Sequence, residues 1–370
     1  MPPPRPGFIL GHVIADYYSS AYVDTYMAST IDAISEAGGG WTLHAQQVTY
    51  KSVDPPVIGD PKPQPSRFQH RTATEEELTL MVEAARARGM KFGLVMELIY
   101  TDLLDPTLDP YGEQNMNAGG RAEETVGEWA DRLALGDPAA QAYWDAWFDQ
   151  YTAAVVKNAE IAQRLGIELF AVGKQAGAVT REENAPRWKK LIAQVRQEYS
   201  GKLTYVSLSG EGAGEYASFP WADLDYVTFY GGPRISVSIR DQPSVADLKA
   251  AFEKNNDEVF EPVSKAAGKP ALFLTAFMSR TQAVEQEWFE WGQPHPEIGL
   301  DLTIQAKLTE AFFQAMEDES WVAGLFSWGF WWRDDTDATL VPGDASYSKG
   351  SSVRNKPATG IWRKWAGQAP

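Results

Sequence analysis

Residues 170–175, Phe-Ala-Val-Gly-Lys-Gln, end a short apolar run with a charged side chain and an amide. A second run of the same kind, residues 272–276, reads Leu-Phe-Leu-Thr-Ala. Neither run alternates apolar with polar side chains. Continuous apolar runs of this length are typical of parallel strands that are buried on both faces. The two stretches therefore predict strands of a parallel sheet with other elements covering both of its sides.

Six further runs of this type occur along the chain, with helical spacing between them. In chain order, the predicted strands cover residues 7–15, 41–48, 91–99, 167–172, 203–208, 226–230, 270–277 and 324–332. The helix that begins at Thr74 carries Glu77 three residues later, which is the capping-box pattern. The alternation of strands and helices predicts the α/β class and a (β/α)8 TIM barrel, with a doubly wound open sheet as the alternative. We expect one domain over residues 1–370, with long loops at 101–138 and 281–302 over its C-terminal face.

The composition argues against several classes of partner. A net charge of -17 would repel the phosphates of a nucleic acid. The chain has no Cys and 4 His, too few ligands for a thiolate or histidine-rich metal site, so we expect neither metal nor cofactor. No apolar stretch reaches the roughly 18–20 residues that span a bilayer, so no membrane partner is expected. We expect a monomer. The compartment stays open between secreted, with a signal removed, and cytoplasmic.

In such a barrel the active site lies at the C-terminal ends of the strands. The residues there suit a hydroxyl-rich neutral ligand, because aromatic rings stack on sugar rings while amides and carboxylates bind hydroxyls. These candidates are His44, Glu97, Lys174, Gln175, Glu211, Tyr230, Thr275, Ala276, Trp328, Trp331 and Asp334. Structural roles are the alternative for several of them. The tryptophans and His44 could be buried core residues, Glu97 could belong to a buried ion pair, and Glu211 could be solvated in a Gly-rich turn.

Longer stretches resemble one enzyme family. Residues 74–91 look like its second helix and third strand, and residues 199–205 look like its Tyr-x-Gly-x-Leu-Thr-Tyr. Residues 170–196 look like a strand that normally ends Gly-Thr-Glu and a helix with Trp-x-x-Leu-Ile-x-x-Val-Arg. Residues 269–279 look like a strand that normally ends Thr-Glu. Over nearly its whole length, the chain resembles the clan A glycoside hydrolases, most closely the β-mannanases of family 113. The resemblance implies a retaining glycoside hydrolase that acts on a β-linked, mannan-like oligosaccharide or polysaccharide.

The resemblance also implies roles for single residues. Gln175 stands at the family's acid/base glutamate, and Ala276, or Thr275 beside it, stands at the nucleophile. Tyr230 matches a tyrosine near the nucleophile, and Trp328 or Trp331 matches the tryptophan on which the sugar stacks. Lys174 replaces a residue that is usually small and polar.

These replacements remove the chemistry that the family needs. A retaining glycosidase uses two carboxyl groups roughly 5–5.5 Å apart, one as acid and one as nucleophile. A glutamine cannot act as an acid and an alanine can do neither task, so double displacement should be blocked in this chain. Three accounts stay open: an engineered inactive variant, a natural carbohydrate-binding pseudoenzyme, or a glycosidase whose carboxylates have moved, for instance to Glu97 with Glu211 or Asp334.

Overall fold

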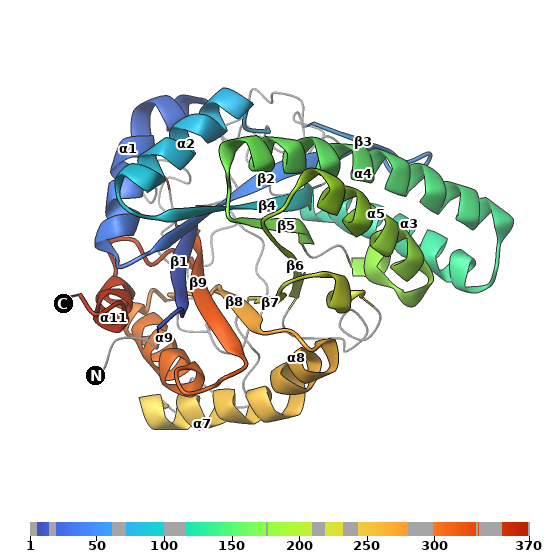
Figure 1. Ribbon diagram of the computed structural model, residues 1–370. Helices are drawn as coiled ribbons and strands as arrows, with labels where there is room; N and C mark the ends of the chain where they lie inside the picture. The colour runs from blue at the N-terminus through green and yellow to red at the C-terminus, as the bar shows by residue number, and fades with distance from the viewer. Residues whose placement is uncertain are drawn as a thin grey trace.

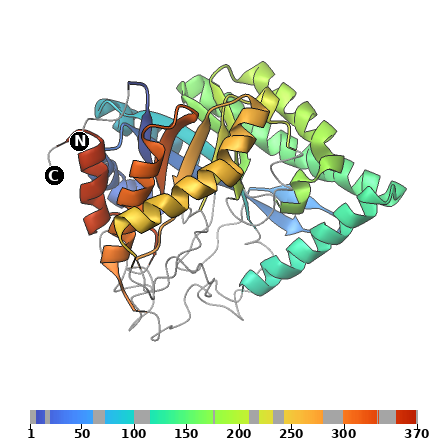
Figure 2. The ribbon, with the colours of Figure 1, turned by 90° about the horizontal axis from the view of Figure 1, so that it is seen from below.

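A closed barrel of eight parallel strands forms the centre of the protein. The computed structural model describes residues 6–14, 20–60, 72–99, 115–174, 177–208, 219–231, 243–279, 299–330, 332 and 350–368. Figure 1 looks onto the N-terminal ends of the barrel strands, and Figure 2 shows the barrel from the side. The strands are hydrogen-bonded in the order β1-β9-β8-β7-β6-β5-β4-β2, and a further pairing of β1 with β2 closes the ring. The predicted (β/α)8 barrel is confirmed, and the open-sheet alternative is wrong.

The barrel strands follow the predicted apolar runs closely. They are β1 (Ile9–Ile14), β2 (Trp41–Ser52), β4 (Lys91–Ile99), β5 (Leu169–Lys174), β6 (Lys202–Leu208), β7 (Val227–Tyr230), β8 (Ala271–Thr275) and β9 (Val322–Phe330). The main difference is at β2, which continues past its predicted end at Val48. Its extension pairs antiparallel with β3 (Val57–Gly59), a short strand that the sequence did not predict.

Helices surround the barrel (Figure 1). They are α1 (Ser20–Glu36), α2 (Glu75–Ala87), α3 (Asn115–Ala134), α4 (Pro138–Leu165), α5 (Ala185–Glu198), α7 (Val245–Asn255), α8 (Glu261–Ala267), α9 (Leu302–Met316) and α11 (Pro357–Trp365). A π-helical turn, η6 (Asn256–Phe260), joins α7 to α8, and short 3-10 turns occur at η2 (Gly177–Thr180), η3 (Glu182–Asn184) and η4 (Trp221–Asp223). The capping box of α2 is confirmed, because the Thr74 side chain accepts from the Glu77 amide and the Glu77 carboxylate accepts from the Thr74 amide.

The helix α3 corrects the prediction of a loop over residues 101–138. It packs against α4, with Trp129 stacked on Tyr143 at a centroid distance of 4.6 Å. Its buried residues Val126, Ala130 and Leu133 are spaced by four and three positions, as one face of a helix requires. The neighbouring Gly119 and Gly120 and the polar composition conceal this signal in the sequence. Residues 101–114, and most of the predicted loop 281–302, lie outside the described residues.

Each barrel strand divides its side chains between two cores. On β4, Val95 faces the interior of the barrel, while Leu94 and Met96 face the surrounding helices. The interior core is formed by side chains from seven of the strands: Ile9, Val13, Leu43, Ala45, Val95, Leu169, Ala171, Val206, Leu272, Leu274, Phe326 and Trp328. This alternation decides which side chains at the strand ends can reach the mouth of the barrel.

The buried His12 makes the stability of the fold depend on pH. It lies on the outer side of β1 between the rings of Phe330 and Trp362, with Nδ1 2.6 Å from Ser327 Oγ. Burial lowers the pKa of His12 from 6.5 to about 3, and a backbone hydrogen bond at Ala37 only partly opposes this. Below pH 6.5 the unfolded chain therefore binds a proton that the folded state cannot bind.

We expect the free energy of unfolding to fall as the pH drops through this window. In His12→Leu, the loss between about pH 7 and about pH 5 should be smaller than in the wild type by about 2 kcal/mol. Urea unfolding at both pH values measures this difference. Val13→Ala is the control, since it destabilises the neighbouring core and leaves the pH dependence unchanged. Equal pH dependence in His12→Leu and the wild type would contradict the assignment.

Candidate functional site

Five of the predicted site residues meet at the C-terminal end of the barrel. Glu97, Lys174, Tyr230, Ala276 and Trp328 lie at the ends of β4, β5, β7, β8 and β9, and we call them the mouth cluster. Tyr230, Ala276 and Trp328 pack against the interior core of the barrel. The strand ends of a parallel barrel converge at one mouth, which explains why residues so far apart in sequence come together.

A buried ion pair lies at the centre of the mouth cluster. Lys174 Nζ contacts Glu97 Oε1, and the two side chains are 5% and 9% exposed. The same ammonium lies 4.0 Å from the centroid of the Trp328 ring and 4.6 Å from that of Tyr230. The two rings meet edge to face at 4.8 Å. Attraction to two ring faces and the Glu97 counter-charge together offset the cost of burying the ammonium.

A β-bulge turns Lys174 into the barrel. Between β5 and β6, Ala171 is opposite Thr204 and Lys174 is opposite Val206, so β5 carries one residue more than its partner. A side chain at Gly173 would point outward to Tyr151 and Tyr205, on the side to which Val172 also points. Strict alternation from Ala171 would have sent Lys174 outward. The extra residue reverses its direction and brings it to Glu97.

Alternation in β8 decides between Ala276 and Thr275. Leu272 and Leu274 face the interior core, and Ala276 continues that series. Thr275 Oγ1 instead donates to the carbonyl of Phe326 at 3.1 Å. The residue that faces the mouth after this strand is therefore Ala276, which offers a methyl group.

His44 is not brought together with the mouth cluster. Its neighbours Leu43 and Ala45 face the barrel interior, so His44 lies on the outer side of β2. Burial lowers its pKa to about 4, opposed by the charge of Glu77 and a hydrogen bond with Gln46. The centroid of its imidazole ring lies 6.4 Å from that of the Trp332 ring. His44 is therefore a neutral core residue between the barrel and the helices around it.

Four other candidates, Gln175, Glu211, Trp331 and Asp334, lie outside the described residues. Within the described part of the chain, no group of three or more His, Asp or Glu is placed to hold a metal ion. None of the helices in that part combines the length and the hydrophobicity that crossing a membrane requires. The described part of the mouth thus presents one ion pair, Lys174 with Glu97, beside the aromatic rings of Tyr230 and Trp328.

Comparisons with known proteins agree with this barrel. The family model Glycoside Hydrolase Family 113 matches residues 123–349. A comparison with curated proteins gave no match.

Among solved structures, a family 113 β-mannanase from Alicyclobacillus acidocaldarius is 22% identical, with a TM-score of 0.65 and 98% of each chain covered. A family 113 β-1,4-mannanase is 19% identical, with a TM-score of 0.66, covering 98% of this chain and 99% of that one. An endo-1,4-β-D-mannanase from Thermotoga petrophila is 12% identical, with a TM-score of 0.52, covering 97% and 99%. At these identities the structural neighbours support the fold.

The ion pair in the mouth should behave as a coupled unit. Lys174→Met leaves the Glu97 carboxylate buried without its partner, and Glu97→Leu leaves the ammonium buried, so each should cost about 3–5 kcal/mol of unfolding free energy. The double variant should recover most of this loss, because no charge is then buried. Urea unfolding of the four proteins measures the coupling.

Lys157→Met provides the matched control, since it breaks the exposed ion pair with Asp60, whose side chains are 60% and 50% exposed. It should leave the midpoint of unfolding close to that of the wild type. Additive losses in the double variant would show that Lys174 and Glu97 act independently and would contradict the prediction.

Proposed function

Because the chain belongs to glycoside hydrolase family 113, we propose that its barrel mouth binds a β-linked, mannan-type oligosaccharide without cleaving it by the retaining mechanism. One observation carries the proposal: the side chain that faces the mouth at the end of β8, the seventh barrel strand, is the methyl of Ala276. In the family, that position is expected to hold the nucleophile.

The mouth cluster has the groups that a sugar requires. Trp328 and Tyr230 form an apolar wall beside Ala276 on which a pyranose ring can stack. Lys174 can donate to sugar hydroxyls, and Glu97 Oε2 has no hydrogen-bond partner among the described residues. The ion pair carries no net charge, which suits an uncharged polyhydroxylated ligand.

The acid position supports binding without cleavage as well. Gln175 follows β5, the fourth barrel strand, where the acid/base glutamate is expected. Its amide can donate and accept hydrogen bonds, but it carries no acidic proton for the leaving oxygen. Double displacement needs both carboxyl groups, so either replacement alone is sufficient to block it.

The proposal is the same for an engineered inactive variant and for a natural pseudoenzyme, because it rests on the side chains that are present. The other account, a glycosidase with moved carboxylates, has Glu97 as its candidate in the described mouth. There one oxygen of the Glu97 carboxylate contacts Lys174, and retaining hydrolysis would still need a second carboxyl group roughly 5–5.5 Å away.

Restoring both carboxylates tests the proposal. The wild type should bind β-1,4-mannopentaose in calorimetry and release no reducing ends from it. Gln175→Glu combined with Ala276→Glu should gain hydrolysis by about a thousandfold or more over the wild type, with retention of anomeric configuration seen by NMR.

The single variants are the matched controls, because each restores one carboxylate and should stay near the wild-type rate. Hydrolysis by the wild type that is lost in Glu97→Gln would overturn the proposal in favour of moved carboxylates. Absence of mannopentaose binding by the wild type would overturn the proposed ligand.

A further inference from the structure

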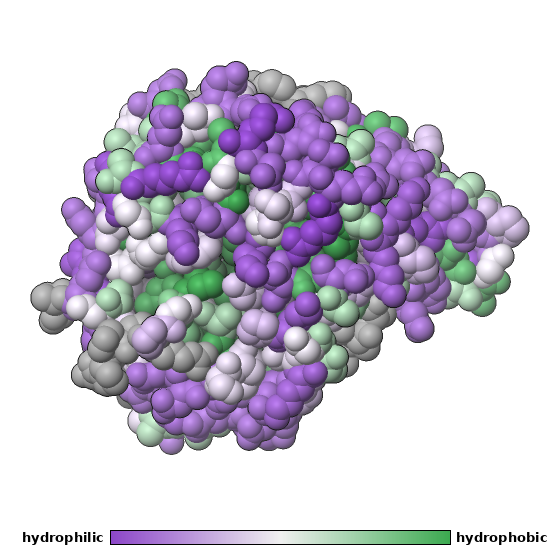
Figure 3. Space-filling model, in the orientation of Figure 1, coloured by the Kyte–Doolittle hydropathy of each residue, from purple (hydrophilic) through white to green (hydrophobic). Residues whose placement is uncertain are grey.

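A large cavity opens at the other end of the barrel, where the strands begin. It measures about 920 Å³, and we call it the N-terminal cavity. The residues that line it include the first residues of four strands, Ile9, Trp41, Lys91 and Lys202. Figure 3 shows this face, on which apolar surface lies in recesses between hydrophilic side chains. The volume falls within the roughly 300–1,000 Å³ that is usual for small-molecule sites.

The interior core separates this cavity from the mouth cluster. Val13, Leu43, Val95, Ala171 and Leu272 fill the barrel between the two ends and are each at most 1% exposed. A ligand in the N-terminal cavity therefore cannot reach the mouth through the barrel, and the two are independent sites.

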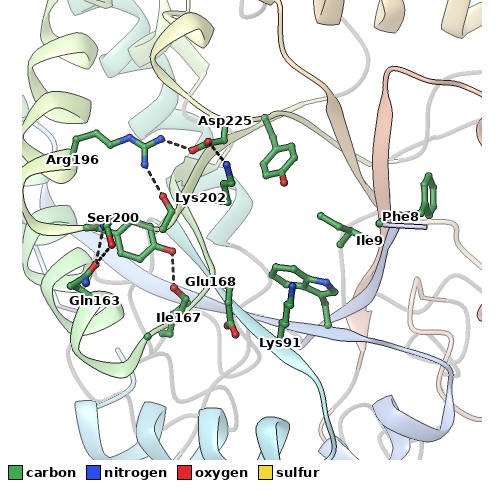
Figure 4. Close-up of a pocket in the computed structure, with 16 residues that line it drawn as sticks. Phe8, Ile9, Lys91, Gln163, Ile167, Glu168, Arg196, Ser200, Lys202 and Asp225 are labelled. Atoms are coloured by element: carbon green, nitrogen blue, oxygen red, sulfur yellow. Dashed lines mark hydrogen bonds and ion pairs between the residues drawn. The ribbon is translucent and has the colours of Figure 1, made fainter. Parts of the chain in front are cut away.

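One wall of the cavity is held together by its own polar contacts. Asp225 accepts hydrogen bonds from Arg196, Lys202 and the Leu203 amide. On the same wall, the Gln163 side-chain oxygen accepts from the Ser200 amide and hydroxyl, at 2.9 and 3.1 Å (Figure 4). These contacts satisfy the wall and fix its shape, as the N-terminal face of a barrel usually requires for stability.

The other lining groups keep unused hydrogen-bonding capacity. Lys91 Nζ lies 5.1 Å from the centroid of the Trp41 ring and makes no ion pair within the described part of the chain. Glu168 accepts from the Phe92 amide with one carboxylate oxygen, which leaves the other available. The hydroxyl of Tyr226 makes no hydrogen bond to a described residue, and its ring also lines the cavity. The cavity thus offers a donor on Lys91, an acceptor on Glu168 and the hydroxyl of Tyr226, together with the aromatic rings of Trp41 and Tyr226.

The charges that line this cavity nearly balance. Arg196 and Lys202 share the single Asp225 carboxylate on the wall, and Lys91 and Glu168 carry opposite charges, so the lining has an excess of one positive charge. The chain as a whole carries -17, so an anion would be repelled over long range and gain little locally. Aromatic rings with both donors and acceptors around them match the alternating apolar faces and hydroxyl edges of a pyranose.

We propose that the N-terminal cavity is a second, non-catalytic carbohydrate site, which binds an uncharged oligosaccharide at the end of the barrel opposite the mouth. Trp41 and Tyr226 supply the ring contacts, while Lys91 and Glu168 bind hydroxyls. The site would let one protein hold two oligosaccharide segments. It is independent of the proposed function at the mouth, and the two can fail separately.

Calorimetry with β-1,4-mannopentaose tests this site in the full chain. The wild type should bind two molecules, and Ala276→Trp, which fills the mouth, should bind one. In the Ala276→Trp background, Lys91→Met and Tyr226→Phe should each weaken the remaining Kd by about fivefold, as expected for one lost hydrogen bond. Lys190→Met, an exposed lysine of α5 outside the cavity, is the matched control and should leave that Kd unchanged. High salt should also leave it unchanged, because the ligand is uncharged.

The outcomes separate the two sites. One molecule bound by the wild type and none by Ala276→Trp would overturn the second site and leave the mouth in place. One bound by each protein, with the Lys91 and Tyr226 effects, would support the second site and overturn binding at the mouth. If Ala276→Trp does not fold, Trp328→Ala replaces it, since removing the stacking ring also weakens the mouth. A Kd that is unaffected by both cavity substitutions would overturn the proposal.

Discussion

The closure of eight parallel strands into one ring is the constraint on which the rest of the structure depends. Closure brings β1 against β2 and β9, and the close approach requires glycine at two places. A Cβ at Gly11 would lie 2.4 Å from the Trp41 carbonyl oxygen, and one at Gly324 would lie 2.4 Å from Ile9. Once the ring is closed, every strand side chain faces either a sealed interior or the helices. Both ends of the barrel, with their different chemistry, follow from that division.

At the mouth, the decisive feature is the buried ion pair between Lys174 and Glu97. The bulge at Val172 and Gly173 turns Lys174 inward, and Glu97 neutralises it against the rings of Trp328 and Tyr230. Beside this pair, Ala276 presents a methyl group. An uncharged ion pair beside an aromatic wall is the surface on which the proposed sugar binding rests. The opposite end of the barrel offers similar recognition chemistry without any family precedent for catalysis there.

Most of the barrel was predictable because a buried parallel strand needs a continuous apolar run. The start of β4 at Lys91 and the capping box at Thr74 were read directly from local patterns. The helix α3 was missed because polar residues and two glycines conceal its narrow buried face. The ion pair of Glu97 with Lys174 could be suspected from two charges at neighbouring strand ends, but alternation alone would have directed Lys174 away from it.

The sequence by itself determined the fold class, the strand ends and the types of side chain available at them. It also determined that positions 175 and 276 carry no carboxylate, since that is a matter of residue identity. Only the tertiary structure decided which of these side chains meet. The direction of a side chain depends on register and bulges between strands distant in sequence, so His44 faces outward, Ala276 rather than Thr275 faces the mouth, and Lys174 reaches Glu97. The N-terminal cavity likewise exists only because closure brings the first residues of β1, β2, β4 and β6 around one space.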